Sequence, residues 1–215
     1  MENNALPGIN PELTDYIETE VIPRYKTFDQ AHTVAHVRAV IADSLSLAQS
    51  CGADVQMAYV IAAYHDTGMA DGRETHHLAS GRILMADRRL RQWFTEEQLR
   101  LMKEAVEDHR ASGKTEPRSI YGKIVADADR EIDHLQPMWR TIQFGRKNYP
   151  ELDKEGSYRR FREHMLEKYA RGGYLRLWIA DSAKARKLQE LQDIIADEDR
   201  LRQTFDRLWA EINAQ

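Results

Sequence analysis

The sequence contains one cysteine, Cys51, among its 215 residues, so an intrachain disulfide is excluded. A chain without disulfides fits a reducing compartment, and we expect a cytoplasmic protein. The first residues show neither a basic nor an apolar segment, so no secretory signal peptide is expected. No apolar run approaches the ~20 residues that a membrane-spanning helix needs. Together these absences predict a protein without a membrane partner.

The chain also lacks an excess of basic residues. Its 31 lysines and arginines are outnumbered by 35 aspartates and glutamates, which gives a formal net charge of −4. A nucleic-acid partner is therefore not expected. A small phosphorylated ligand would need its positive charge from a local patch of side chains or from a metal ion. The hydrophobic share of 42% is ordinary for a globular protein with a substantial core.

Segments with the alternating pattern of β-strands are absent as well, and we find no internal repeat. Almost every segment instead places its apolar residues three or four positions apart, as in amphipathic helices. Asn10-Pro11 has the form of a helix start, and Thr95 with Gln98 forms a capping box. Gly52 and Gly68 each follow an apolar stripe and are expected to end a helix. The sequence therefore predicts an all-α fold.

The expected domain organisation has three parts. Residues 1–28 form an N-terminal helix packed on the core, and residues 29–136 form a helical core. Residues 137–215 add further helices as an extension of the same domain. Within this extension, residues 175–212 are expected to be helical with a break near Asp181. These amphipathic helices suit packing either on the domain or on a second copy of the chain.

The pair His65-Asp66 is the feature around which the rest of the core is arranged. It follows Met57–Tyr64, a helical run that is apolar on almost every face and is therefore expected to be buried. Burying ionisable groups is costly unless they are paired or bind a metal. We therefore expect His65 and Asp66 to lie where a core helix ends and a pocket opens. The alternative is a hydrogen-bonded core histidine beside a solvated aspartate.

Histidines are concentrated in the same region, because six of the eight fall between residues 32 and 109. His32 and His36 are four residues apart, so we expect them on one helix face. His109 continues the apolar stripe of the helix that begins after Thr95. One such histidine is usually a satisfied core residue. Several of them with inward aspartates suit zinc, manganese, iron or nickel.

Two aspartates on a later helix are the remaining acidic candidates. The apolar stripe of the helix that follows Ser119 is centred near Tyr121. At about 100° per residue, Asp129 lies roughly 80° from that centre and Asp127 roughly 120° away on the other side. We therefore expect Asp129 to face inward. Asp127 is expected either to support a neighbouring group or to contact solvent.

The order of these residues resembles the H…HD…D signature of the HD-domain metal-dependent phosphohydrolase superfamily. The resemblance rests on His36, on the pair His65-Asp66 and on Asp129, with the flanking segments 32–37, 62–68 and 128–130. It extends over roughly residues 29 to 135 and implies a helical bundle. It further implies that these four residues hold one divalent ion and that Asp66 and His65 form the catalytic pair.

Members of this superfamily with two metal ions have two more histidines between the central pair and the last aspartate. His77, with His76 as its alternative, and His109 occupy fitting positions. The resemblance then implies that Asp66 bridges two ions of manganese, iron, zinc, nickel or cobalt. Many members also have a lysine after the glycine of the central motif, where this chain has Met69. Contacts to a substrate phosphate are therefore expected from Arg73, Lys123 and Arg130.

The function that the resemblance implies is hydrolysis of a phosphate ester or anhydride by metal-activated water. The expected substrate is a nucleotide or another small phosphorylated metabolite. Two alternatives come from other classes of protein. One is an oxygenase that uses two irons on the same scaffold, because the full set of six ligands suits it. The other is a non-catalytic interaction domain whose helices a metal holds together.

Overall fold

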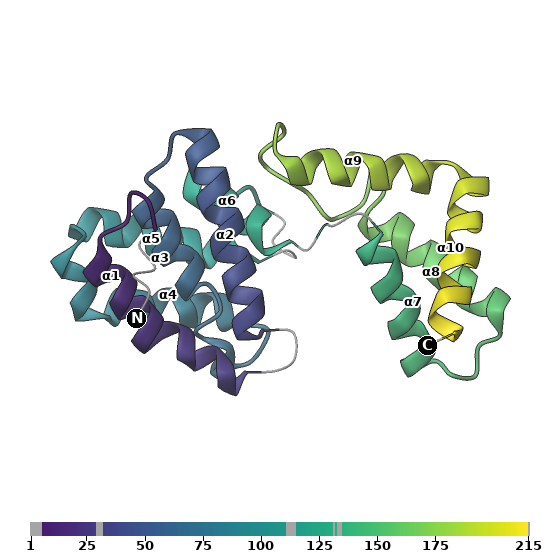
Figure 1. The fold of residues 1–215 in the computed structure, drawn as a ribbon, viewed down its shortest axis with the longest axis horizontal. Helices are drawn as coiled ribbons and strands as arrows, with labels where there is room; N and C mark the ends of the chain where they lie inside the picture. Colours follow the sequence, from purple (N-terminus) through teal and green to yellow (C-terminus); the bar gives the residue numbers. More distant parts are fainter. Residues whose placement is uncertain (1–5, 29–31, 111–114, 131, 133–134, 215) are drawn as a thin grey trace. The chain divides into compact units, whose positions relative to one another are not determined.

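The computed structural model describes residues 6–28, 32–110, 115–130, 132 and 135–214. The described residues form helices and turns without a strand, so the predicted all-α fold is confirmed (Figure 1). The chain divides into two compact units, one at residues 1–130 and one at residues 131–215. None of the described helices combines the length and apolar character that crossing a bilayer requires.

The α-helices of the first unit are α1 (Pro11–Tyr16), α2 (Val34–Cys51), α3 (Val55–Tyr64), α4 (His76–Ala86), α5 (Glu96–Asp108) and α6 (Ile120–Asp129). Shorter helical turns lie at Ile17–Val21, Ile22–Thr27, Met69–Asp71 and Arg88–Gln92. Helix α3 packs against α2, α4, α5 and α6. Every residue of α3 from Met57 to Tyr64 is buried, as its apolar sequence predicts. The end of α3 therefore lies among four surrounding helices.

The expected helix boundaries in this unit are largely observed, and their causes are local. The side chain of Asn10 caps α1, and Thr95 with Gln98 forms the predicted capping box of α5. Helix α2 ends at Cys51 because Gly52 takes a left-handed conformation with φ of 65°. This helix begins only at Val34, with Thr33 as its cap. His32 therefore precedes the helix, and the expectation that it shares a helix face with His36 is wrong.

The second unit contains α7 (Gln136–Asn148), α8 (Lys154–Lys168), α9 (Ala183–Ala196) and α10 (Glu198–Asn213). Its helices share a core of their own, to which Met138, Phe161, Leu191 and Phe205 contribute. The helical region expected from residue 175 begins later than predicted, at Ala183, just after the predicted break near Asp181. Residues 169–182 connect α8 to α9 without a helix, and the break between α9 and α10 falls at Asp197. Asp197 caps α10 with its side chain, which explains the position of that break.

The predicted domain scheme places one boundary between residues 136 and 137. The division into compact units falls earlier, between Arg130 and Glu131. The first unit includes the predicted N-terminal segment and all four residues of the H…HD…D signature. Whether residues 137–215 extend the same domain stays a prediction.

Candidate metal centre

The end of α3 is held in place by side chains that satisfy its terminal backbone groups. Tyr25, which is fully buried, donates its hydroxyl to the carbonyl oxygen of Ala63 at 3.0 Å. The same hydroxyl accepts the backbone N–H of Asp66 at 3.3 Å. Nδ1 of His65 lies 2.7 Å from the carbonyl oxygen of Ala62. The backbone and the imidazole of the central pair are thus fixed before any ligand binds.

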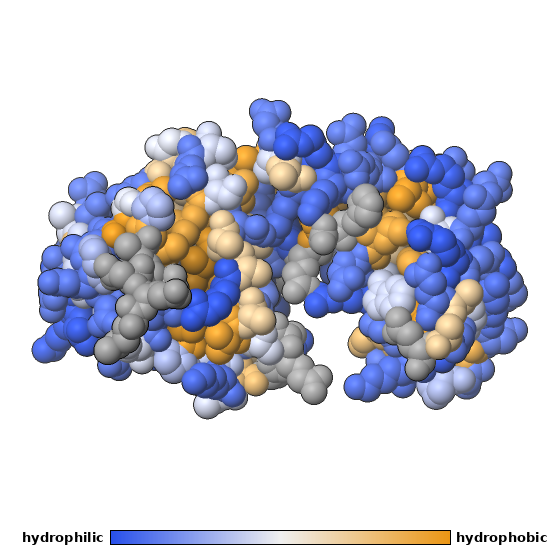
Figure 2. Space-filling view, viewed as in Figure 1, coloured by the Kyte–Doolittle hydropathy of each residue, from blue (hydrophilic) through white to orange (hydrophobic). Residues whose placement is uncertain are grey.

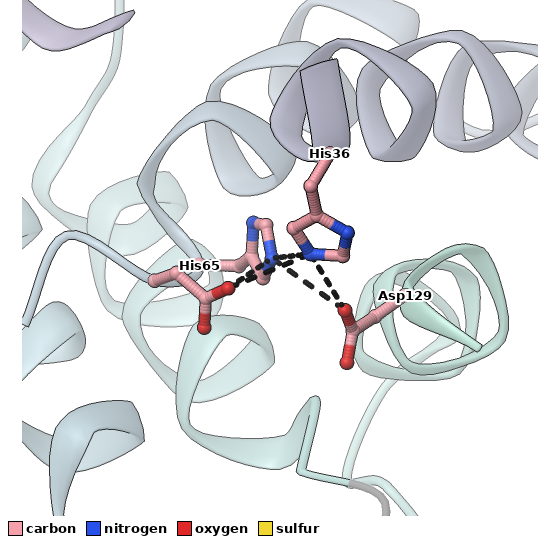
Figure 3. A group of neighbouring side chains, drawn as sticks. His36, His65 and Asp129 are labelled. Atoms are coloured by element: carbon pink, nitrogen blue, oxygen red, sulfur yellow. Dashed lines mark hydrogen bonds and ion pairs between the residues drawn. The ribbon is translucent and has the colours of Figure 1, made fainter. Parts of the chain in front are cut away.

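Four side chains meet at this end of α3 and form the first ligand group. They come from α2, from the end of α3 and from the last residue of α6, and they are His36, His65, Asp66 and Asp129. Nε2 of His36 lies 3.1 Å from Oδ1 of Asp129, and Nε2 of His65 lies 2.9 Å from Oδ2 of Asp66 (Figure 3). The two imidazole Nε2 atoms are 3.3 Å apart. The structure thus brings together all four residues that the signature singles out.

A second group shares Asp66 with the first. Oδ1 of Asp66 lies 3.3 Å from Nε2 of His76 and 3.4 Å from Nε2 of His109, and these two nitrogens are 3.1 Å apart. His76, not His77, contributes to this group, so the predicted His77 is corrected to its neighbour. His77 follows one step round the first turn of α4 and belongs to neither group. Asp66 thus directs one carboxylate oxygen to each group, as a bridging ligand requires.

The hydrogen bonds at Nδ1 of the histidines prepare both groups to bind a metal ion. Nδ1 of His65, His76 and His109 each lies 2.6–2.8 Å from a backbone carbonyl oxygen. A carbonyl oxygen can only accept, so each Nδ1 carries a hydrogen, and in the neutral form of each ring the lone pair of Nε2 points inward. Lone pairs that face one another, with buried carboxylates beside them, need a cation between them. Carbonyl contacts of this kind are the usual supports of metal-binding histidines.

The distances and the donor set also fit a metal ion. Two ligands about 2.0–2.1 Å from one ion in tetrahedral geometry stand roughly 3.3 Å apart. The separations of 2.9–3.7 Å among neighbouring atoms of the first group are close to that value. Nitrogen and carboxylate oxygen donors without cysteine suit zinc, manganese, iron, nickel or cobalt. Both groups therefore fit the divalent ions that the resemblance implies.

The pKa values of His65 and Asp66 are shifted in the directions that favour the charged form of each side chain. Burial disfavours a charged His65, yet its pKa is raised well above the usual value by the carboxylates of Asp66 and Asp129. Burial disfavours a charged Asp66 too, but His65 and hydrogen bonds from His109 and His36 hold the pKa of this carboxyl well below its usual range. The raised pKa favours a proton on His65, and metal binding must displace this proton, so metal affinity rises with pH.

Helix α4 is docked against the turn after His65-Asp66, and this contact sets the position of His76. The backbone N–H of Gly68 donates to Oγ of Ser80 at 2.8 Å. A Cβ atom at Gly68 would lie 2.5 Å from both the carbonyl oxygen of His76 and the backbone nitrogen of Ser80. Only glycine allows the turn and the first turns of α4 to approach so closely.

We expect Gly68→Ala to push α4 away from the turn and to separate His76 from Asp66. The predicted cost is about 1–3 kcal/mol of stability, as for other overpacked sites, together with weaker binding of the second ion. Chemical denaturation and metal titration measure the two effects. Gly172→Ala is the control, because a Cβ atom there meets nothing within 4 Å. Equal stability and equal metal binding of Gly68→Ala and Gly172→Ala would contradict this account.

His32 is a residue of the centre to which the sequence assigned no role. Its Nε2 lies 3.9 Å from Oδ2 of Asp66, and its ring centre lies 6.0 Å from that of His36 and 6.3 Å from that of His76. Its side chain is 18% exposed, whereas that of His65 is fully buried. His32 thus borders both groups on a side that solvent reaches. The spacing of four residues from His36 placed His32 near the centre. The sequence did not show that His32 precedes α2.

The three cations expected to bind substrate differ in their surroundings. The carbonyl oxygen of Arg73, in the turn before α4, contacts Nδ1 of His76. Nζ of Lys123 pairs with Glu116 at 2.5 Å. Arg130 is buried, and its guanidinium donates to the carbonyl oxygen of Ala126 in α6. A role of these three in substrate binding stays a prediction.

Asp127 and Asp129 differ in burial and in their neighbours. Oδ1 of Asp129 belongs to the first group, and its side chain is 21% exposed. Asp127 lies outside both groups but is fully buried, so the expected alternative of a solvent contact is wrong for it. The ranking of these two as metal ligands, with Asp129 ahead, therefore agrees with the geometry.

Comparisons with known proteins agree with the motif. Residues 33–132 match the family model of the HD domain, and this range contains both ligand groups. The chain is also similar to a solved structure, a protein described as a predicted HD superfamily hydrolase from an uncultured Thermotogales bacterium. The two share 16% identity with a TM-score of 0.56, over 93% of this chain and 91% of that one. This likeness concerns the fold. None of the curated proteins compared with the chain matches it.

Proposed function

We propose that the chain, whose residues 33–132 match the family model of the HD domain, hydrolyses a phosphate ester or anhydride of a nucleotide or another small phosphorylated metabolite. The observation that supports this most directly is the division of Asp66 between two groups of ligands. Two adjacent ions joined by one carboxylate suit the attacking and leaving oxygens of a phosphoryl group. Proteins with this donor set also include oxygenases, so the reaction itself needs a test.

The residues of the chain would have distinct roles in this hydrolysis. His36, His65, Asp66 and Asp129 would hold one divalent ion, and His76 and His109 would hold a second one with Asp66. A bound ion of this kind supplies a nucleophilic water at neutral pH and polarises a phosphoryl oxygen.

His32 suits a contact with the substrate rather than with the ions. Its imidazole lies beside Asp66 on the more exposed side of the centre. There it can donate a hydrogen bond to a phosphoryl oxygen or give a proton to the leaving oxygen. Asp129 borders the same centre with a partly exposed carboxylate. Substrate is therefore expected to approach between His32 and Asp129.

The test begins with the metal content of protein purified without chelator. Elemental analysis should find a transition metal in at least stoichiometric amount. The loaded protein should release phosphate or a phosphorylated product from members of a panel of nucleotides, dinucleotide anhydrides and simple phosphate esters. Chelator-treated protein is the matched control. The assay is run with and without oxygen, because an oxygenase consumes oxygen and a hydrolase does not.

The outcomes separate the three candidate functions. Phosphate release that depends on metal and is indifferent to oxygen supports the hydrolase. Oxygen consumption without phosphate release would replace it with the oxygenase. Bound metal with neither activity, and loss of helical structure on chelation, would favour a metal-stabilised interaction domain. Protein that takes up no metal even on reconstitution would contradict all three.

A further inference from the structure

The second unit contains a hollow that the proposed reaction does not use. It has a volume of about 430 Å³ and lies between residues 171–180 and the first turns of α9. Its lining includes Arg171, Arg176 and Trp178, with Leu175 and Leu188 among the apolar residues. A connection as long as residues 169–182 without helix or strand is uncommon in a compact unit and often carries a function.

The segment around this hollow is basic in an otherwise acidic chain. Residues 168–187 include one acidic residue, Asp181, and six cationic residues, Lys168, Arg171, Arg176, Lys184, Arg186 and Lys187. The whole chain has a net charge of −4. Figure 2 shows mainly hydrophilic side chains along α9. The local charge therefore favours an anionic ligand.

The two arginines that line the hollow differ in their partners. The guanidinium of Arg171 forms an ion pair with Asp193 at 2.7 Å, although its side chain is 66% exposed. Arg176 is exposed and has no acidic partner within the described part of the chain. Arginine binds phosphate oxygens through two parallel N–H groups. Arg176 is thus the side chain best placed to bind a phosphate group at this hollow.

The other lining residues favour a ligand with a flat ring. Trp178 is partly buried, and it lies in the lining with apolar residues such as Leu175 and Leu188. The hollow combines apolar and polar surface, and its volume is within the usual range of small-molecule sites. The N-terminal turn of α9 adds a favourable dipole for an anion, because Ala185 in this turn also lines the hollow.

We propose that this hollow is a second binding site, separate from the metal centre, for a small phosphorylated ligand with an aromatic ring, such as a nucleoside diphosphate. The phosphates contact Arg176 and the start of α9, and the ring packs against Trp178 and the neighbouring leucines. The inference does not depend on the proposed hydrolysis, because no residue of the metal centre lines the hollow.

The experiment titrates ADP into the full chain carrying Asp66→Ala, in which the metal centre is disabled. Isothermal titration calorimetry should detect binding at one site. Adding Arg176→Ala should weaken it about tenfold through the loss of a charged hydrogen bond. Arg200→Ala, which removes an exposed arginine of α10, should leave it unchanged. Adenosine and pyrophosphate should each bind more weakly than ADP, because adenosine lacks the phosphates and pyrophosphate lacks the ring.

Three results would overturn the proposal. One is equal ADP binding with and without Arg176→Ala. Another is pyrophosphate binding as tight as that of ADP, which would exclude the aromatic contact. The last is loss of ADP binding in both Asp66→Ala and chelator-treated wild-type protein, which would place the nucleotide at the metal centre. Circular dichroism of each variant shows that the fold is intact.

Discussion

Asp66→Ala should lower turnover by about a thousandfold or more and should leave less than one equivalent of bound metal. The reason is geometric, since Asp66 is the one described residue whose carboxylate contributes an atom to each ligand group. Its loss leaves three ligands in the first group and two histidines in the second. Helical circular dichroism should be largely retained, because the side chain bridges ligands and does not fill the apolar core. Elemental analysis and a phosphate-release assay measure both effects.

His32→Ala is the matched comparison for this variant. His32 borders Asp66 at 3.9 Å but belongs to neither ligand group. We expect it to retain the wild-type metal content while turnover falls about 10²-fold, as for loss of a proton donor. If Asp66→Ala kept both ions and wild-type turnover, the pair His65-Asp66 would have no part in the mechanism. If His32→Ala lost metal in proportion to activity, His32 would be a ligand rather than a substrate contact.

The fold follows from the sequence wherever a local signal decides it. Capping residues such as Asn10, Asp54 and Thr95 and the left-handed Gly52 mark helix ends by their own hydrogen bonds and backbone angles. The extent of the helical region after residue 175 was wrong because its apolar spacing continues through a segment without helix. The break predicted near Asp181 agrees with the start of α9, which Ser182 caps.

The first ligand group could be predicted because its residues form an ordered motif on helices that pack around α3. His36, His65 and Asp129 lie on three elements whose inward faces the apolar stripes identify. The contribution of His32 could not be predicted, because it depends on where α2 begins. The partners of Lys123 and Arg130 were equally inaccessible, since flexible side chains form pairs that spacing does not encode.

The choice between His76 and His77 also could not be made from the sequence, because it depends on tertiary contacts. Adjacent positions on a helix point about 100° apart, so the start of α4 decides which imidazole faces Asp66. That start is fixed by the contact of Gly68 with Ser80 and by the carbonyl oxygen of Arg73 that contacts Nδ1 of His76. Both are tertiary or loop interactions. The sequence left His76 and His77 as candidates for the second ligand group, and packing places His76 in that group.

His76→Ala should therefore reduce bound metal from two equivalents to one, whereas His77→Ala should leave two. His76 supplies one of three ligand atoms of the second group, and its loss leaves only Oδ1 of Asp66 and Nε2 of His109. The first group keeps its four ligands, so one ion stays bound. Turnover should fall about 10²–10³-fold, because a single ion stabilises only one of the two reacting oxygens.

His77→Ala is a closely matched control, since it removes the same side chain one position along the same helix turn. The ring of His77 packs 5.7 Å from that of His76, so a small loss of stability is expected without loss of metal. Metal titration of both variants, followed by elemental analysis, gives the stoichiometry directly. A wild-type protein that saturates at one equivalent, with His76→Ala as active as His77→Ala, would show a mononuclear site. The reverse ranking would show that α4 begins in a different phase and that His77 is the ligand.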